Sequence, residues 1–197
     1  MNRRNVKNVR IVKRLLERPD GTWTKYKLAQ ASGCSRQWVI QFIRKLEELE
    51  LVGGTRVKDP LGLIRFGANA TPKPLKVLNL FHTDPVEFVR KHTDRYAFTT
   101  YSAENMVTHH LFPHRYDVYL EMETMHEVYE RTFIEGWLGT GNTRLIVPVD
   151  GTIVDDFRLV GDVRVVGMGQ LLIDLVREGG VAEEAVQEMI RRDVWRR

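Results

Sequence analysis

Arginine and glutamine side chains recur along one short segment, at Arg36, Gln37, Gln41 and Arg44. An arginine guanidinium can donate two hydrogen bonds to guanine O6 and N7, and a glutamine amide makes a matching pair with adenine N6 and N7. These four side chains are therefore candidates for reading base edges in the major groove of duplex DNA. Trp38, in the same segment, is more typical of a packing residue than of a base contact.

Other basic or hydroxyl side chains near this segment could contact the phosphates of a duplex. Such contacts set the register and the affinity of DNA binding, but they carry no sequence information. The candidates for phosphate contact are Arg3, Arg4, Lys7, Arg10, Ser35, Lys45, Arg56 and Lys58.

Charge is unevenly distributed along the 197 residues. Residues 1–67 carry 15 Lys and Arg against 6 Asp and Glu, a net charge of +9, whereas residues 68–197 carry 15 against 20, a net charge of −5; together they give the +4 of the whole chain. A basic part joined to an acidic part suggests a nucleic-acid-binding module attached to a domain with another role.

Two counts limit the class of protein. Cys34 is the only cysteine, which excludes an internal disulfide and a multi-cysteine zinc site. The longest stretch without Asp, Glu, Lys or Arg is the ten residues from Asn105 to His114, whereas a membrane-spanning helix needs about 18 or more apolar residues. We therefore expect a cytoplasmic protein that does not span a membrane.

Three helices are predicted in the basic part. Apolar residues at three- and four-residue spacing predict a helix over residues 5–18. Thr24 can cap a short second helix, which ends at a tight turn where Gly33 takes a positive φ at little cost. Ser35 can cap a third helix. Its predicted core positions are Val39, Phe42, Ile43, Leu46 and Leu49.

A hairpin is predicted to follow the third helix. Thr55–Lys58 and Leu63–Phe66 are short β-prone runs on either side of the turn residues Asp59-Pro60-Leu61-Gly62. A short helix, a glycine turn and a longer serine-capped helix form a helix-turn-helix, and a hairpin directly after it is called a wing.

The segment Thr24–Val52, with KLAQASGCSRQWVIQFIRKLEELELV, therefore resembles the winged helix-turn-helix family of transcription regulators. The resemblance implies that the N-terminal part of the third helix enters the major groove. The alternative is a winged helix that contacts protein instead of DNA.

The remaining residues predict a second domain. The segment 68–74 contains two prolines among small residues and is expected to be a linker between a winged helix-turn-helix over 1–67 and a domain over 75–197. In that domain a helix begins at Asp84-Pro85 and another at Ser102. Strands are expected at Tyr96–Thr99, Tyr116–Glu121, Thr143–Val149 and Val163–Val166, and further helices at Met122–Ile134, Gln170–Arg177 and Ala182–Arg192. Interleaved strands and helices predict an α/β (α+β) class with one mixed sheet.

The second domain carries a resemblance of its own. The segments YAFTTYSAENM, YDVYLEME, VVGMGQLLIDLVREGG and EEAVQEMIRR look like the C-terminal domain of the AbiEi family. That family comprises the antitoxin and repressor partners of type IV toxin–antitoxin, or abortive-infection, systems. It joins an N-terminal winged helix to a domain of nucleotidyltransferase-like fold, which is the order proposed here.

The resemblance also places a degenerate nucleotidyltransferase site at Ser102, Asp117 and Tyr119. Active members of that fold have a Gly-Ser pair at a helix start and two carboxylates, two residues apart, that bind Mg²⁺. Here no glycine precedes Ser102, and Tyr119 stands in the second carboxylate position. Glu121 shares the strand face with Asp117 but lies about 13 Å further along, too far to share one Mg²⁺. No catalytic residue is predicted.

The histidines offer a competing chemistry. His109, His110 and His114 are close in sequence, and neutral imidazole is a common metal ligand. Pro113 disfavours the continuous helix that would align His110 with His114. Because no cysteine lies nearby and the closest carboxylate is Asp117, we expect loop histidines, with no metal and no cofactor.

These observations predict a sequence-specific, DNA-binding transcriptional regulator. The resemblance implies an antitoxin and autorepressor of a type IV toxin–antitoxin system, with a cognate toxin as protein partner. The DNA partner would be an operator in the form of an inverted repeat, bound by a homodimer or by cooperative monomers. Two alternatives remain: a nucleotidyltransferase that its winged helix delivers to nucleic acid, and a repressor that senses a small ligand.

Overall fold

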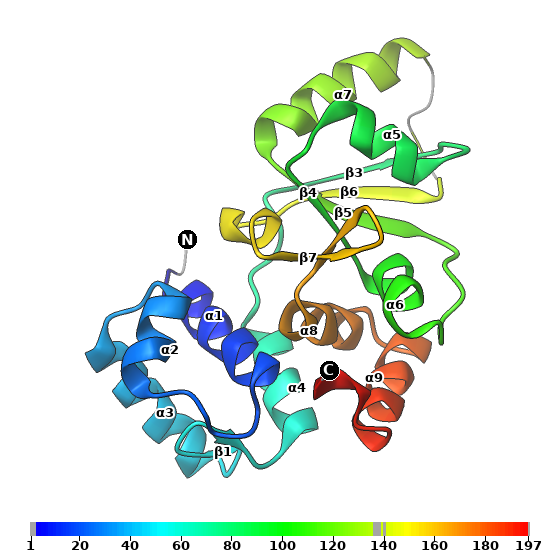
Figure 1. Cartoon of the computed structure of the whole chain (residues 1–197). Coiled ribbons are helices and arrows are strands. Elements are labelled where there is room, and N and C mark those ends of the chain that lie inside the picture. The colour runs from blue at the N-terminus through cyan, green and yellow to red at the C-terminus, as the bar shows by residue number, and fades with distance from the viewer. Residues whose placement is uncertain (1–2, 136–138, 140, 197) are drawn as a thin grey trace. The chain divides into compact units, whose positions relative to one another are not determined.

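The computed structural model describes residues 3–135, 139 and 141–196, without the side chains of residues 3–4 and 132–135 (Figure 1). The chain forms two compact units. The helical unit comprises Met1–Pro72 with Met168–Arg197, and the sheet unit comprises Lys73–Gly167. The predicted α/β class is confirmed, with a mixed six-stranded sheet. Within the described residues, no helix is long and apolar enough to cross a membrane.

The helical unit begins with the three predicted helices. Thr24 caps the second, since its side chain accepts the Lys27 backbone N–H, and Gly33 ends that helix with φ +62°. The core positions predicted for the third helix are buried except Leu49, which is 49% exposed because the helix ends at Glu48. The elements of the unit are α1 (Arg3–Glu17), α2 (Lys25–Ser32), α3 (Arg36–Glu48), β1 (Val52–Gly53), β2 (Arg56–Val57), α4 (Pro60–Ala70), α8 (Met168–Glu178), α9 (Val181–Arg191) and the 3-10 helix η2 (Val194–Arg196).

The hairpin after α3 is shorter and earlier than predicted. Strands β1 and β2 pair in antiparallel fashion around Gly54-Thr55, and Leu63–Phe66, predicted as a strand, belong to α4. These residues form a helix instead of a strand because the start of the helix is well capped. The Asp59 side chain accepts the Gly62 N–H at 2.9 Å, and Pro60 occupies the first helical position, where a missing N–H costs nothing. The linker predicted over 68–74 is likewise shortened, since α4 continues to Ala70.

The predicted domain over 75–197 is wrong at its C-terminal end. Helices α8 and α9 pack in the helical unit, where α8 contacts α1, α4 and α9. Every residue of α8 from Met168 to Leu175 is buried, so the helix needs partners on several sides. Small residues allow close contact: a Cβ on Gly169 would lie 2.4 Å from the Lys13 carbonyl oxygen, and one on Gly67 would lie 3.0 Å from Ile173 Cδ1.

The sheet unit contains a six-stranded mixed sheet. In spatial order the strands are β3 (Lys76–Leu80), β6 (Thr143–Val147), β5 (Tyr116–Leu120), β4 (Tyr96–Thr99), β8 (Val163–Val166) and β7 (Phe157–Val160). The pairs β5–β6 and β4–β8 are parallel, and the other three are antiparallel. The four central strands were predicted, whereas the edge strands β3 and β7 were not.

Helices cover both faces of this sheet. They are α5 (Pro85–His92), α6 (Thr100–Thr108) and α7 (Met122–Glu135), with the 3-10 helix η1 (Gly151–Val154). Figure 1 shows α5 and α7 on one face and α6 on the other. The predicted cap at Ser102 is wrong: α6 begins at Thr100, and the buried Ser102 hydroxyl donates back to the Thr99 carbonyl at 3.2 Å.

Candidate nucleic-acid interface

The outward side of α3 carries the candidate base-reading residues. At about 100° of rotation per residue, positions 37, 41, 44 and 48 lie within an arc of about 60° opposite the buried row. Gln37, Gln41 and Arg44 are exposed and form the N-terminal three members of this row, and Glu48 is the fourth. Arg36 is exposed at the N-terminal flank of the same helix. The four predicted side chains are thus all accessible, and three of them lie in one line.

Trp38 connects α3 to α1. Its indole Nε1 donates to Asn8 Oδ1 at 3.1 Å, and the Lys7 ammonium lies 5.4 Å from the ring centroid. The side chain is half-buried in this contact. The packing interpretation of Trp38 therefore fits the structure, and the same contact places Lys7 beside the first turn of α3.

Other predicted phosphate contacts surround the beginning of α3. The Ser35 side chain caps α3 by accepting the Trp38 N–H at 3.2 Å, and its hydroxyl hydrogen can still be donated. Arg10 lies near the turn before it, since a Cβ on Gly33 would be 3.3 Å from Arg10 Nη1. Further along α3, Lys45 is exposed and its ammonium lies 5.7 Å from the Phe66 ring centroid. The side chains of Arg3 and Arg4 lie outside the described residues.

The hairpin is tied to the loop between α1 and α2. Thr55 Oγ1 lies within hydrogen-bond distance of two carbonyl oxygens, 3.1 Å from Gly21 and 2.8 Å from Trp23. The Val57 N–H donates to the Pro19 carbonyl at 2.9 Å. These contacts fix β2, which carries Arg56 and is directly followed by Lys58.

The other side of the hairpin is tied to α3. The Gly54 N–H donates to Glu47 Oε1 at 2.7 Å. Arg56 is exposed, and its Nε donates to the Asp20 carbonyl at 3.3 Å. Lys58 is also exposed, and its side chain lies over Gly53, where a Cβ would be 2.7 Å from Lys58 Cε. The hairpin and the residue after it thus present both cations from a short, anchored edge.

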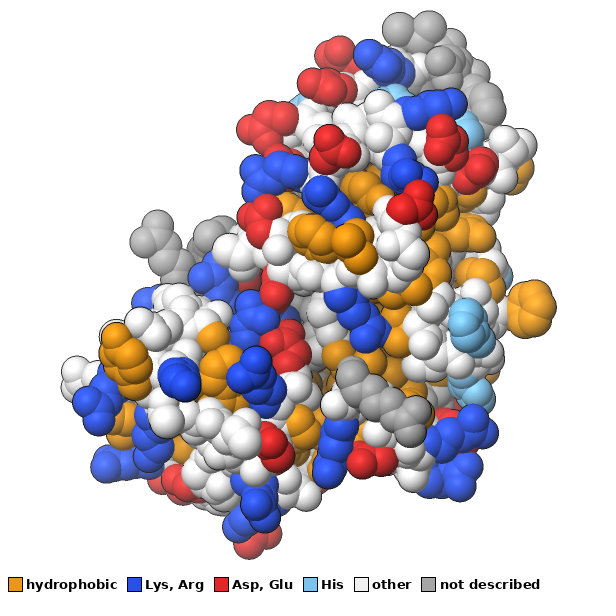
Figure 2. All heavy atoms as spheres, in the orientation of Figure 1, with side chains coloured by type: hydrophobic (Ala, Val, Ile, Leu, Met, Phe, Trp, Pro, Cys, Tyr) orange, Lys and Arg blue, Asp and Glu red, His pale blue; other side chains and the backbone are white. Residues whose placement is uncertain are grey.

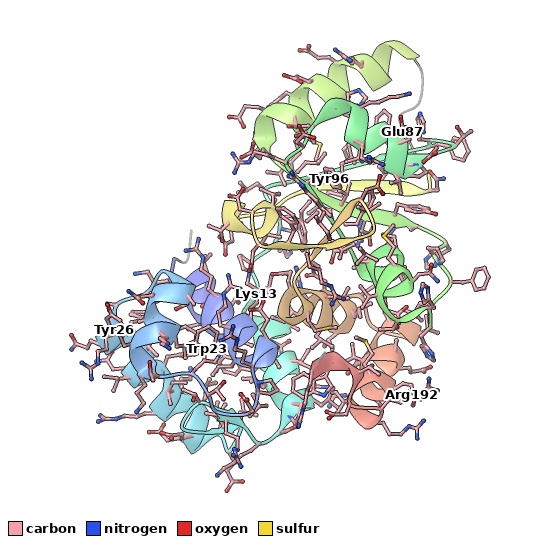
Figure 3. All side chains as sticks on the ribbon, viewed as in Figure 1. Lys13, Trp23, Tyr26, Glu87, Tyr96 and Arg192 are labelled. Carbon is pink, nitrogen blue, oxygen red and sulfur yellow. The ribbon has the colours of Figure 1, made fainter. Side chains whose placement is uncertain are left out.

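Sequence reasoning missed the exposed side of α2. Tyr26 is 59% exposed, and its hydroxyl accepts a hydrogen bond from Gln30 Nε2 at 3.0 Å. Figure 3 shows Tyr26 pointing outward from α2, and Figure 2 shows Lys and Arg side chains around α2 and α3. Lys27 is exposed one residue further along. The sequence could have indicated this surface, because Thr24 marks the start of α2 and the first helix of a helix-turn-helix crosses the DNA backbone.

In the sheet unit, the degenerate nucleotidyltransferase site predicted from the sequence is centred on the Asp117 carboxylate, which is held by ion pairs. Asp117 is fully buried on β5, and both of its oxygens are occupied by protein donors. Arg115 donates to them at 2.7 and 3.0 Å, Arg144 of β6 donates at 2.8 and 2.8 Å, and the Thr100 hydroxyl makes a further hydrogen bond. Tyr119, two residues along the same strand, is buried. This carboxylate is therefore a structural ion-pair partner with its lone pairs in use.

The histidines are not part of this cluster. His109 and His110 are exposed, and the His114 ring lies 4.2 Å from the Tyr101 ring centroid. Across the described ranges, no group of three or more His, Cys, Asp or Glu side chains is arranged to hold a metal ion.

Removing the Asp117 carboxylate is expected to destabilise the sheet unit. Asp117→Ala would remove the buried carboxylate that accepts hydrogen bonds from two partly buried guanidinium groups, and we expect a loss of about 2–3 kcal/mol in the free energy of unfolding. Urea denaturation followed by circular dichroism measures this loss of stability. The control is Asp162→Ala, which removes an exposed partner of Arg90 and should cost less than about 1 kcal/mol. Equal costs for the two variants would contradict the structural role of Asp117.

Comparison of the chain with protein-family models, with curated proteins and with solved structures finds no match.

Proposed function

We propose that this chain is a sequence-specific, DNA-binding transcriptional regulator whose helix α3 reads base edges in the major groove. The observation that carries the proposal is the exposed row of Gln37, Gln41 and Arg44 on a capped helix whose opposite side is buried. Side chains that can form bidentate hydrogen bonds, on a helix that follows a glycine turn, are the arrangement that major-groove readout uses.

The surrounding cations support the proposal. Lys7 and Arg10 flank the start of α3, Lys27 is on the outer side of α2, and Arg56 and Lys58 are on the anchored hairpin. Together with the net charge of +9 over residues 1–67, they offer phosphate contacts around the proposed reading helix.

The proposal assigns the sheet unit a role in contacts with a partner. The carboxylate that a nucleotidyltransferase would use for Mg²⁺ is held by Arg115, Arg144 and Thr100, which argues against catalysis there. The resemblance to the AbiEi family extends the proposal to a cytoplasmic antitoxin and autorepressor with a cognate toxin, acting on an inverted-repeat operator as a homodimer or as cooperative monomers.

The test separates base reading from phosphate contact. Gln37→Ala or Gln41→Ala should relax the preference at one or two base pairs, each by about 1–3 kcal/mol, because a bidentate pair is lost. Lys58→Ala should weaken binding to all sequences alike. Fluorescence anisotropy on the best duplex and on its single-base variants distinguishes these patterns.

The matched control is Glu48→Gln, at the C-terminal end of the same row of α3. It should leave the base preference unchanged, because the N-terminal part of the helix is the part that enters the groove. If the glutamine variants and Lys58→Ala weakened all sequences by the same factor, the placement of α3 in the groove would be wrong.

A further inference from the structure

An open groove lies between α4, α8 and α9, entirely within the helical unit. Its volume is about 410 Å³, within the range of small-molecule sites. It is lined by Arg65, Ala68, Asn69, Val176, Arg177 and Glu183.

Two polar side chains of the lining, Arg177 and Asn69, have N–H groups that can donate to a ligand. Arg177 forms an ion pair with Asp174, one turn earlier on α8, but at 3.9 Å from Asp174 Oδ1 its Nη1 lies beyond hydrogen-bond distance. Asn69 is exposed. Within the described part of the chain, neither the Arg177 guanidinium nor the Asn69 amide makes a hydrogen bond. Both can donate to a carboxylate, and the guanidinium can do so through two N–H groups.

The other charges in the groove limit the ligand to one negative group. Arg65 donates both Nε and Nη2 to Glu183 Oε1, at 2.9 and 2.7 Å, so α4 and α9 are already linked by an ion pair. Glu183 in the lining and Asp174, the ion-pair partner of Arg177, oppose a second negative charge. Ala68 and Val176 supply the apolar part of the lining.

We propose that this groove binds a small monocarboxylate, with its carboxylate on Arg177 and Asn69 and its apolar body against Ala68 and Val176. The ligand regulates DNA binding through α4; this part rests on the proposed function. Phe66, next to Arg65 on α4, has its ring 5.9 Å from that of Phe42 on α3. A ligand that shifts α4 would therefore act on a helix that contacts the proposed reading helix through Phe66.

Binding is tested by calorimetry on the full-length protein, with benzoate and hexanoate as probes and benzamide and inorganic phosphate as comparisons. A carboxylate probe should bind at one saturable site with a Kd of about 1 mM or tighter. Benzamide lacks the charge, and phosphate lacks the apolar body, so both should bind at least tenfold more weakly. Arg177→Gln should weaken carboxylate binding at least tenfold, whereas Arg191→Gln, on α9 outside the lining, should not change it.

The outcomes separate the two proposals. The inference is overturned if neither carboxylate binds, if benzamide or phosphate binds as well, or if Arg177→Gln has no effect while thermal unfolding shows an intact fold. With a duplex present, a saturating carboxylate should change DNA affinity at least about fivefold. An unchanged DNA affinity would overturn the proposal that the ligand regulates DNA binding. Failure of the chain to bind any duplex would overturn the proposed function, and calorimetry would still decide carboxylate binding.

Discussion

Raising the salt concentration from 50 to 200 mM is expected to lower the affinity of the full-length protein for a duplex about a thousandfold. Each phosphate neutralised by Lys or Arg releases condensed counterions, so about six contacts give a slope near −5 for log K against log[salt]. The structure offers at least six exposed or partly exposed cations for these contacts: Lys7, Arg10, Lys27, Lys45, Arg56 and Lys58.

Fluorescence anisotropy titrations at four or five salt concentrations measure this slope. Lys58→Ala should make it shallower by about one, because one phosphate contact is lost. Lys73→Ala provides the control, since Lys73 is exposed on the sheet unit and should leave the slope unchanged. A slope shallower than about −2 would contradict the assignment of these cations to phosphates.

Removing α8 and α9 is expected to abolish the fold of the helical unit. A protein that ends at Pro72 lacks Leu171, Leu172, Ile173 and Leu175, all fully buried in α8. Burial of each such side chain contributes about 1.5–3 kcal/mol, so the loss of all four is comparable to the whole stability of a domain. Circular dichroism of residues 1–72 should therefore show no cooperative thermal transition.

The matched variant keeps these helices and removes the sheet unit instead. Replacing residues 73–167 with a linker of about ten Gly and Ser residues preserves α8 and α9, and the protein should unfold cooperatively and still bind DNA. If residues 1–72 alone unfolded cooperatively and bound DNA equally well, the C-terminal helices would not belong to the DNA-binding fold.

Much of the helix-turn-helix could be predicted because its signals are local. The caps at Thr24 and Ser35 and the positive φ of Gly33 are properties of a few neighbouring residues. The buried positions of α3 follow the helical period, which one sequence displays directly. The exception, Leu49, fits the period but lies one residue beyond the end of the helix.

The features that were missed depend on contacts between distant residues. The apolar pattern of α8 shows that the helix is buried, but it does not show that its partners include α1 and α4 instead of the preceding sheet. Leu63–Phe66 are compatible with a strand, and a single hydrogen bond from the Gly62 N–H to Asp59 helps to start a helix instead. For Asp117, Arg115 is a near neighbour, but Arg144 reaches it across two paired strands.

The central claim is that α3 reads base edges, and selection of duplexes from a random pool tests it most directly. The wild-type protein should enrich one sequence motif, in which adenine occupies the positions that Gln37 and Gln41 contact. Gln41→Arg should replace adenine with guanine at one of these positions and leave the others unchanged, because arginine matches guanine O6 and N7. The claim would be contradicted if the wild-type protein enriched no motif, or if Gln41→Arg enriched the wild-type motif unchanged.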